Sequence, residues 1–260
     1  MKKNKLLTLF VFLVYIFLFG PLLIVAVTAF GTDNFIAFPP KHIGIRWFVH
    51  VFQSPTFMTT LGISLEVSIA ATLIALIVGI PACYVISRND FRGKKFINNI
   101  FLSPVTIPGI VLGFALFRFI TITLKMNILT SLLIGHVVIV IPYIIRVIGS
   151  SLGGLDYSIE EAAISLGASR IKTFFLVVMP NITSGIIAAF MLAFINSFNN
   201  VPVSIFLTGP GVSTLPISMM SYVEYNYDPS VSALSVILMF MTIIIMFIVE
   251  KTLGLNYFTK

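Results

Sequence analysis

Two charged residues and a group of three asparagines lie within stretches of the chain that are otherwise apolar. Glu66 and Arg118 are charged, and Asn196, Asn199 and Asn200 lie close together further along the chain. In a lipid environment a charge is costly unless it is paired or faces water, and amide side chains seek partners or solvent. We therefore expect Glu66 and Arg118 either to form a structural ion pair or to line a polar path, and we expect the three asparagines to line the same path.

The other reactive residue types form no catalytic or metal-binding pattern. His42, His50 and His136 have no H-E-x-x-H motif or carboxylate cluster beside them, which favours loop or packing roles. Gly93-Lys94-Lys95 lacks the upstream glycine and the hydroxyl of the nucleotide-binding motif G-x-x-x-x-G-K-S/T. We assign no catalytic residue, no metal and no cofactor to this chain, and we do not expect it to hydrolyse ATP.

A polar segment over about residues 149–180 carries a more organised pattern. Ser158 and Glu161, three residues apart, predict a capping box, in which the hydroxyl and the carboxylate satisfy backbone donors at a helix start. Gly167 is the residue type that most easily adopts the left-handed conformation after a helix end. Together these signals predict a short helix over about residues 159–166.

The side chains of this short helix suit contact with another protein. Ala162 and Ala163 permit close approach, and apolar residues beside them can anchor a partner. A second amphipathic stretch follows over residues 170–179, and Pro180 then takes a position that is tolerated in the first turn of the next helix. From these residues alone two interpretations stay open: a docking surface, or a connector that caps two membrane helices.

Composition predicts the elements that position these residues. Apolar residues make up 58% of the 260-residue chain and charged residues 10%, whereas soluble domains carry about 25% charged residues. A helix needs about 20 apolar residues to cross the ~30 Å hydrocarbon core of a bilayer. We expect an all-α polytopic membrane protein with six transmembrane helices, organised as a single domain over residues 1–260. The six apolar stretches cover residues 6–30, 57–86, 97–124, 128–148, 182–207 and 232–249.

Basic residues in the connections predict the orientation of these helices, because cytoplasmic loops carry an excess of Lys and Arg. Twelve such residues fall on one side and three on the other, so both termini and the segment 149–180 are expected in the cytoplasm. The net charge of +7 follows this distribution without a dense basic cluster, and nucleic acid is not an expected partner. The twelve are Lys2, Lys3, Lys5, Arg88, Arg92, Lys94, Lys95, Arg146, Arg170, Lys172, Lys251 and Lys260, and the three are Lys41, Arg46 and Lys125.

The segment after the fourth predicted helix resembles a known signature. Glu161-Ala162-Ala163, then Gly167 after three residues, then Val177 and Met179-Pro180 are similar to the EAA pattern of binding-protein-dependent importer permeases. In that pattern EAA is followed by three residues, G, nine residues and I-x-L-P, so Val177 and Met179 are small departures. The resemblance extends over roughly residues 54–253. Two patches are similar to the spermidine/putrescine branch: PVTIPGIVLG at 104–113 and TGPGVSTLPISMMSYVEYNYDPSVSAL at 208–234.

This resemblance implies a permease subunit of a type I ATP-binding-cassette importer in a bacterial plasma (inner) membrane. It implies a coupling helix that docks on an ATPase, with six residues in this role: Ser158, Glu161, Ala162, Ala163, Gly167 and Pro180. The implied partners are a second permease subunit, two ATPase subunits that bind ATP and magnesium, an external solute-binding protein and the lipid bilayer. Spermidine or putrescine is the first expected solute, with aminoalkylphosphonate, opine, thiamine or iron as alternatives.

Two other classes of function stay open at this point. A dimeric secondary carrier or channel would need coupling-ion sites near the membrane midplane, and Glu66 is the sole candidate acid for one. A membrane-embedded enzyme would need a clustered nucleophile, base or metal site, and none is visible. An ATPase partner would distinguish the importer subunit from both.

Overall fold

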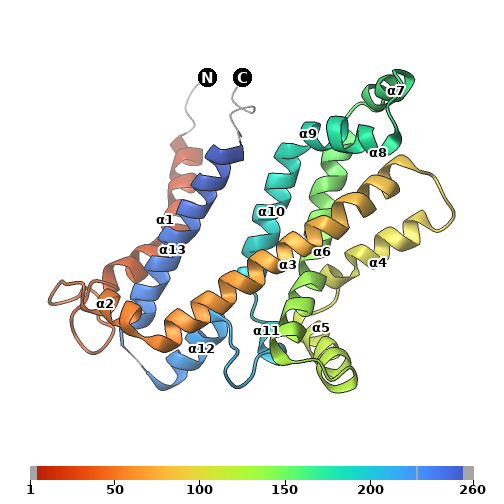
Figure 1. Ribbon diagram of the computed structural model, residues 1–260. Helices are drawn as coiled ribbons and strands as arrows, with labels where there is room; N and C mark the ends of the chain where they lie inside the picture. Colours follow the sequence, from red (N-terminus) through yellow and green to blue (C-terminus); the bar gives the residue numbers. More distant parts are fainter. Residues whose placement is uncertain (1–4, 227, 254–260) are drawn as a thin grey trace. The chain divides into compact units, whose positions relative to one another are not determined.

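The computed structural model describes residues 5–226 and 228–253, and within these ranges the regular structure is helical (Figure 1). The contacts divide the chain into two compact units. Among the described residues, the first comprises those up to Thr59 together with Ser218–Ile245, and the second comprises Thr60–Ile217 together with the last residues of α13. The helices are α1 (Lys5–Thr28), α2 (Arg46–Gln53), α3 (Pro55–Arg88), α4 (Lys94–Thr106), α5 (Gly109–Leu116), α6 (Ile128–Gly154), α7 (Tyr157–Ser165), α8 (Arg170–Thr173), α9 (Met179–Asn181), α10 (Thr183–Phe198), α11 (Ser204–Leu207), α12 (Leu215–Tyr225) and α13 (Ser230–Leu253), with π-helical turns at Phe117–Thr123 and Phe174–Val178.

The first unit joins α1 to α13 and carries the amphipathic helix α2. At the end of α1 the Thr28 Oγ1 atom lies 3.2 Å from Ser232 Oγ, within hydrogen-bond distance. In α2 only Trp47 and Val51 are buried, and the Trp47 indole N–H donates to the Asp33 carbonyl over 3.1 Å. One buried edge on a short helix with a single Trp is the pattern of an element that lies along a membrane surface.

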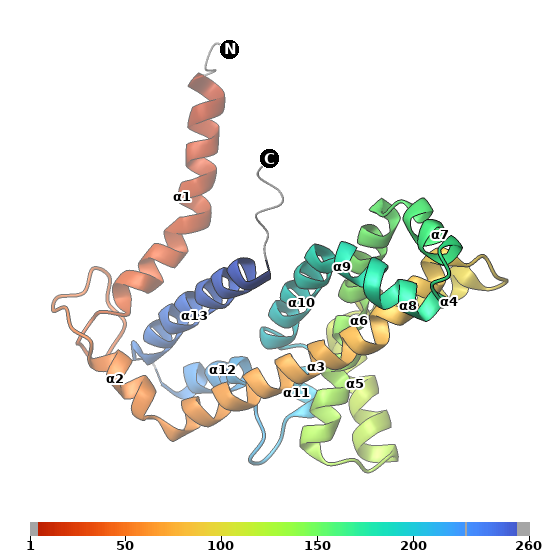
Figure 2. The same ribbon diagram turned by 45° about the horizontal axis from the view of Figure 1, so that its top comes forward.

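The second unit is built around α6, which carries eleven buried residues and packs against several other helices of that unit. Helix α10 packs along α6, and α4 and α11 cover further parts of it (Figure 2). Apolar side chains of α3 and α6 meet where Gly79 faces Ile144, and a Cβ on Gly79 would lie 2.9 Å from the Ile144 Cγ2 atom. A glycine therefore permits this close approach of two long helices.

The third and fifth expected spans are each broken by a sharp bend. Helix α4 and the segment Gly109–Thr123 meet at 105°, and the segment Arg170–Asn181 meets α10 at 72°. Ile107, at the first break, has an extended backbone (φ −88°, ψ 135°) because the ring of Pro108 disfavours a helical residue before it. After the second break, α10 ends at Phe198. Within the rest of the expected stretch 182–207, only the four residues of α11 are helical.

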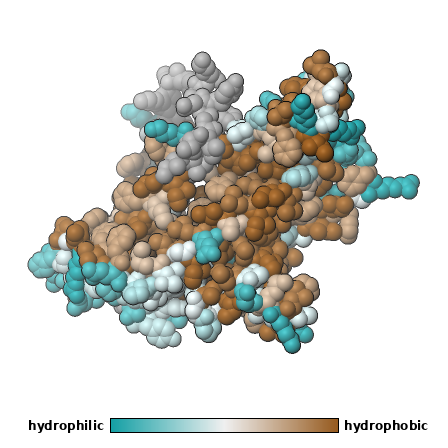
Figure 3. Space-filling model, in the orientation of Figure 1, coloured by the Kyte–Doolittle hydropathy of each residue, from teal (hydrophilic) through white to brown (hydrophobic). Residues whose placement is uncertain are grey.

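Helices α1, α3 and α6 are long and apolar enough to cross a membrane as continuous elements, and there are up to five crossings if each bent pair counts as one. Helix α13 covers the sixth expected stretch. The count of six therefore stays a prediction. Large apolar side chains are exposed along most of α1. Hydrophobic residues also cover much of the face drawn in Figure 3. A helix that is apolar on all sides matches lipid rather than water as its solvent.

Candidate functional site

Helix α7 begins differently from the expected capping box. Its N-cap is Asp156, whose Oδ1 accepts a hydrogen bond from the Ser158 backbone N–H over 3.0 Å. Ser158 thus lies in the first turn, and Glu161 does not reach back to a capping position. An aspartate with an extended backbone before the helix supplies a charged acceptor beside the positive helix end, which explains why it takes the cap. Hydrogen bonds from the Ser158 backbone and hydroxyl lower the pKa of Asp156.

The C-terminal end of α7 confirms the expectation for Gly167. Its φ is +92°, in the left-handed region that favours glycine. The Gly167 N–H donates to the Ile164 carbonyl over 2.9 Å, and the Ala168 N–H donates to the Ala163 carbonyl over 3.1 Å. This pair of bonds is a Schellman motif, which satisfies carbonyls that a helix end leaves free.

One face of α7 is uncovered. Glu161 and Ala162 are exposed, and so are three large apolar side chains: Ile159 is 42% exposed, Ile164 38% and Leu166 89%. Exposed apolar residues beside short alanines form a surface that another protein can cover. Pro180 lies apart from this helix, in α9, and the chain bends at Ile182 before α10 begins. Pro180 therefore precedes a break, where it was expected to open the fifth span.

The opposite face of α7 is held by Glu160, which the sequence analysis did not select. Glu160 is 1% exposed, and its Oε1 accepts a hydrogen bond from Arg88 Nε over 2.7 Å. The Tyr84 hydroxyl donates to Oε2 over 2.8 Å. The usable signal is the Glu160-Glu161 pair, because neighbouring residues point in directions about 100° apart around a helix, so one carboxylate can face a packed neighbour while the other faces solvent. Arg88 entered the sequence analysis only as an orientation signal.

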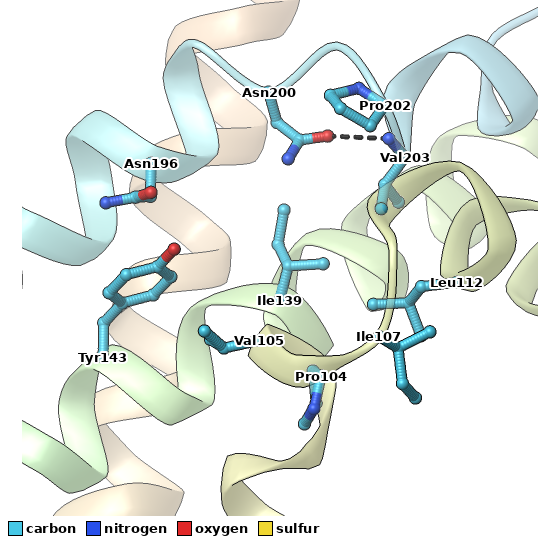
Figure 4. Close-up of a pocket in the computed structure, with 11 residues that line it drawn as sticks. Pro104, Val105, Ile107, Leu112, Ile139, Tyr143, Asn196, Asn200, Pro202 and Val203 are labelled. Carbon is cyan, nitrogen blue, oxygen red and sulfur yellow. Dashed lines mark hydrogen bonds between the residues drawn. The ribbon is translucent and has the colours of Figure 1, made fainter.

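A cavity of about 180 Å³ lies between α6, α10, the break between α4 and α5, and the segment that follows α10 (Figure 4). Asn196 and Asn200 line it, whereas Asn199 is exposed at the end of α10 and is not a lining residue. The Tyr143 hydroxyl points toward Asn196. The complete lining is Pro104, Val105, Ile107, Gly109, Leu112, Ile139, Tyr143, Asn196, Asn200, Pro202 and Val203.

Glu66 and Arg118 lie outside this cavity. Both side chains are exposed, and neither forms an ion pair with a residue that the structure describes. The expected ion pair between them is therefore absent from the described chain. The alternative, that they line a polar path, stays a prediction. Both side chains are exposed on this chain, so what they face depends on a partner subunit or on lipid.

Buried polar groups fix the wall of the cavity. His136 is 1% exposed; its Nδ1 lies 2.7 Å from Ser197 Oγ and its Nε2 lies 3.0 Å from Ser204 Oγ. The Ser204 hydroxyl donates to the Asn200 carbonyl over 2.7 Å, so its hydrogen is not free for His136. Nε2 must then donate and Nδ1 must accept from Ser197, which makes His136 a neutral bridge between α6, α10 and α11.

The comparisons with known proteins identify the family. Residues 71–253 match the family described as "Binding-protein-dependent transport system inner membrane component". The chain belongs to this family. It is a permease subunit of an ATP-binding-cassette importer and a multi-pass membrane protein, and the resemblance found in the sequence is confirmed.

Relatives and solved structures agree with this assignment. The permease is 29% identical to putrescine transport system permease protein PotI of Escherichia coli, over 86% of this chain and 82% of PotI. It is 29% identical to spermidine/putrescine transport system permease protein PotC of Haemophilus influenzae, over 90% and 91% of the two chains. It is 28% identical to molybdate/tungstate transport system permease protein WtpB of Pyrococcus abyssi, over 84% and 88%.

The fold is also that of solved importers. A bacterial ABC transporter involved in the import of the acidic polysaccharide alginate superposes with a TM-score of 0.75, at 17% identity, and the match covers 100% of this permease and 99% of that chain. The MetNI methionine ABC transporter, in an inward-facing conformation, gives a TM-score of 0.61 at 21% identity, with 77% and 98% covered. These likenesses concern the fold alone.

The cap of α7 gives a testable pH dependence in the permease. In the variant Asp156→Ala we expect faster amide exchange at Ser158 and Ile159, because the first turn loses its side-chain acceptor. Asp156→Asn should keep the cap and lose its pH dependence, since asparagine is also a good N-cap residue. In the wild type the contribution is present above the pKa of Asp in the unfolded chain and is lost as pH falls through the lower folded-state pKa.

Hydrogen exchange measured over a pH series, corrected for intrinsic rates, checks this expectation. Asp90→Ala is the matched control, because Asp90 is 99% exposed on another loop and pairs with Lys94. Equal protection of the first turn in wild type and Asp156→Ala would contradict the assigned cap.

Proposed function

We propose that this permease, together with a second permease subunit, two ATPase subunits that bind ATP and magnesium, and an external solute-binding protein, imports a small polyamine such as putrescine or spermidine. The similarity to PotI and PotC over most of each chain is the observation that carries the choice of solute. The match to a binding-protein-dependent family supports the external partner, and the missing nucleotide-binding motif supports a separate ATPase.

Helix α7 is the proposed contact with the ATPase. The exposed residues Glu161 and Ala162, with Ala163 beside them, lie on a helix that is firmly terminated by Gly167 and keeps apolar side chains uncovered. Ser158 belongs to the first turn of the same helix, and Pro180 lies in α9, near the end of the segment that follows it. The orientation with both termini and α7 in the cytoplasm follows from the distribution of basic residues.

The cavity lined by Tyr143, Asn196 and Asn200 is proposed as part of the translocation path. Its polar groups are a phenol and two amides, so it offers neutral acceptors to an amine without the strong hold of a carboxylate. Weak contacts suit a site that a solute must leave quickly. Glu66, Arg118 and Asn199, which this chain leaves exposed, are proposed to face the path from outside the cavity.

Uptake in cells tests the solute and the transport system together. Cells that lack this permease should lose uptake of radiolabelled putrescine or spermidine, and the wild-type chain should restore it. Radiolabelled molybdate is the informative competitor, because WtpB is a molybdate/tungstate permease and an oxyanion has the opposite charge. Restored molybdate uptake without polyamine uptake would overturn the choice of polyamine.

Co-purification tests the ATPase contact. The wild-type permease should bring an ATPase subunit with it, identified by mass spectrometry, and Gly167→Pro should lose that subunit because proline cannot adopt the φ of +92°. Gly153→Ala, at a helical position with no neighbour within 4 Å of the added Cβ, is the matched control. A permease that purifies without any ATPase would contradict the proposed assembly.

A further inference from the structure

We propose that Arg88, at the end of α3, is the residue through which movement of α7 reaches the membrane helices, with Glu160 as its anchor on α7 and Tyr84 holding the second carboxylate oxygen. This inference rests on the proposed contact between α7 and an ATPase. It names α3 as the helix that is driven and the Glu160–Arg88 pair as the link.

The link is a buried charge pair with both carboxylate oxygens occupied. The Arg88 and Glu160 side chains are 13% and 1% exposed, and the second guanidinium nitrogen of Arg88 lies 2.6 Å from Oε1. Leaving either charge buried without its partner is strongly unfavourable, so the two residues must move together. Among the residues that the structure describes, the other ion pair, Lys94–Asp90, has an almost fully exposed carboxylate and carries no such constraint.

Arg88 also contacts the residues at and just before the start of α7. Its Nη2 donates to the Leu155 carbonyl over 3.3 Å, and its guanidinium lies 5.3 Å from the centre of the Tyr157 ring. Arg88 therefore contacts the connection before α7, the first residue of α7 and its buried Glu160. Because Arg88 is held by several contacts, a movement of α7 in any of several directions also moves Arg88. With a single hydrogen bond, α7 could instead rotate about that bond without moving Arg88.

Helix α3 can carry a displacement far from this point. It is 34 residues long, and Cys83 and Gly79 contact α6 along its length. Toward its other end, the Ser64 hydroxyl accepts a hydrogen bond from the Leu215 N–H, at the start of α12, over 2.7 Å. Helix α3 therefore contacts both α7 and the start of α12, and Figures 1 and 2 both place α7 beside the end of α3 that bears Arg88.

A double substitution separates a link from a structural brace. Glu160→Gln and Arg88→Gln each leave one charge buried alone, whereas the double variant leaves none and should recover thermal stability. The measurements on the purified importer complex are the melting temperature, the ATP hydrolysis rate and the uptake of putrescine per ATP hydrolysed. We expect uptake per ATP to stay about tenfold or more below wild type in the double variant, a coupling loss within the usual range for linked sites.

Two further variants sharpen the result. Arg88→Lys keeps the charge and should restore part of the coupling, because lysine cannot reproduce the forked contacts of arginine. The pair Asp90→Asn with Lys94→Gln, on the adjacent exposed ion pair, should leave uptake per ATP unchanged. If uptake per ATP returns to the wild-type value whenever stability does, Glu160 and Arg88 are only a brace and the inference is wrong. Absence of ATP-dependent putrescine uptake in the wild-type complex would instead defeat the proposed function itself.

Discussion

Replacing Gly113 with alanine is expected to lower the melting temperature of the permease and to abolish most of its transport. A Cβ at this buried position in α5 would lie 2.8 Å from the Pro202 carbonyl oxygen and 2.9 Å from the Val203 Cα atom. Both are backbone atoms, so no side-chain rotation relieves the overlap. Overpacking of this kind costs about 1–3 kcal/mol, and here it also displaces two residues of the cavity wall.

The matched control is Gly62→Ala, because Gly62 lies inside helix α3 and a Cβ there meets no atom within 4 Å. In a helix interior the change from glycine to alanine stabilises by about 0.5–1 kcal/mol, so the two substitutions should have opposite signs. Thermal unfolding in detergent and radiolabelled putrescine uptake measure the two effects. An unchanged melting temperature for Gly113→Ala would show that α5 and the Pro202–Val203 segment do not approach as closely as described.

Replacing His136 with leucine should produce the second large effect. His136 bridges Ser197 and Ser204 in a buried site, and its loss leaves two hydroxyl groups without that partner. Each buried polar group left unsatisfied costs about 1–3 kcal/mol, and the serines recover part of this by bonding to carbonyls of their own helices. Because Ser204 also bonds to the Asn200 carbonyl, the wall of the cavity should shift and uptake should fall.

A triple variant tests whether the hydrogen bonds carry this effect. His136→Leu with Ser197→Ala and Ser204→Ala removes all three polar groups, and replacing both partners of a bond by apolar groups is far less costly than removing one. We expect its melting temperature to lie above that of His136→Leu alone. His42→Leu, at an exposed position, is the control and should be neutral. A triple variant less stable than His136→Leu would indicate that packing, and not the polar bridge, holds α6 to α10 and α11.

Much of the fold was accessible to sequence reasoning. The six apolar stretches fall on helical regions of the structure, and Gly167 ends α7 as its residue type indicates. Hydropathy and left-handed glycines are local signals, so they need no knowledge of distant residues. The breaks in the third and fifth spans were only partly indicated by the sequence. Pro108 makes a break natural, but hydropathy shows only that a stretch is apolar, and the same stretch can be straight or bent.

The candidate site also has parts that were predictable from the sequence and parts that were not. The pattern from Glu161 to Gly167 located the proposed ATPase contact, because its spacing is local and matches a family signature. Glu160 could not be identified as a site residue from the sequence, because its role depends on a contact with Arg88, which lies 72 residues away in the chain. The cap residue was misassigned since Asp156 and Ser158 both have suitable side chains, and only the backbone before Tyr157 decides between them.

By itself, the sequence of this permease determined the lipid environment, the helical class and the family, because composition and short motifs report on local chemistry. The tertiary structure decided which asparagines reach the cavity, which glutamate is buried and how His136 is bridged. Those outcomes depend on the directions in which side chains of distant segments meet. Burial makes each of them specific, since a polar group removed from solvent must find its partner within the protein.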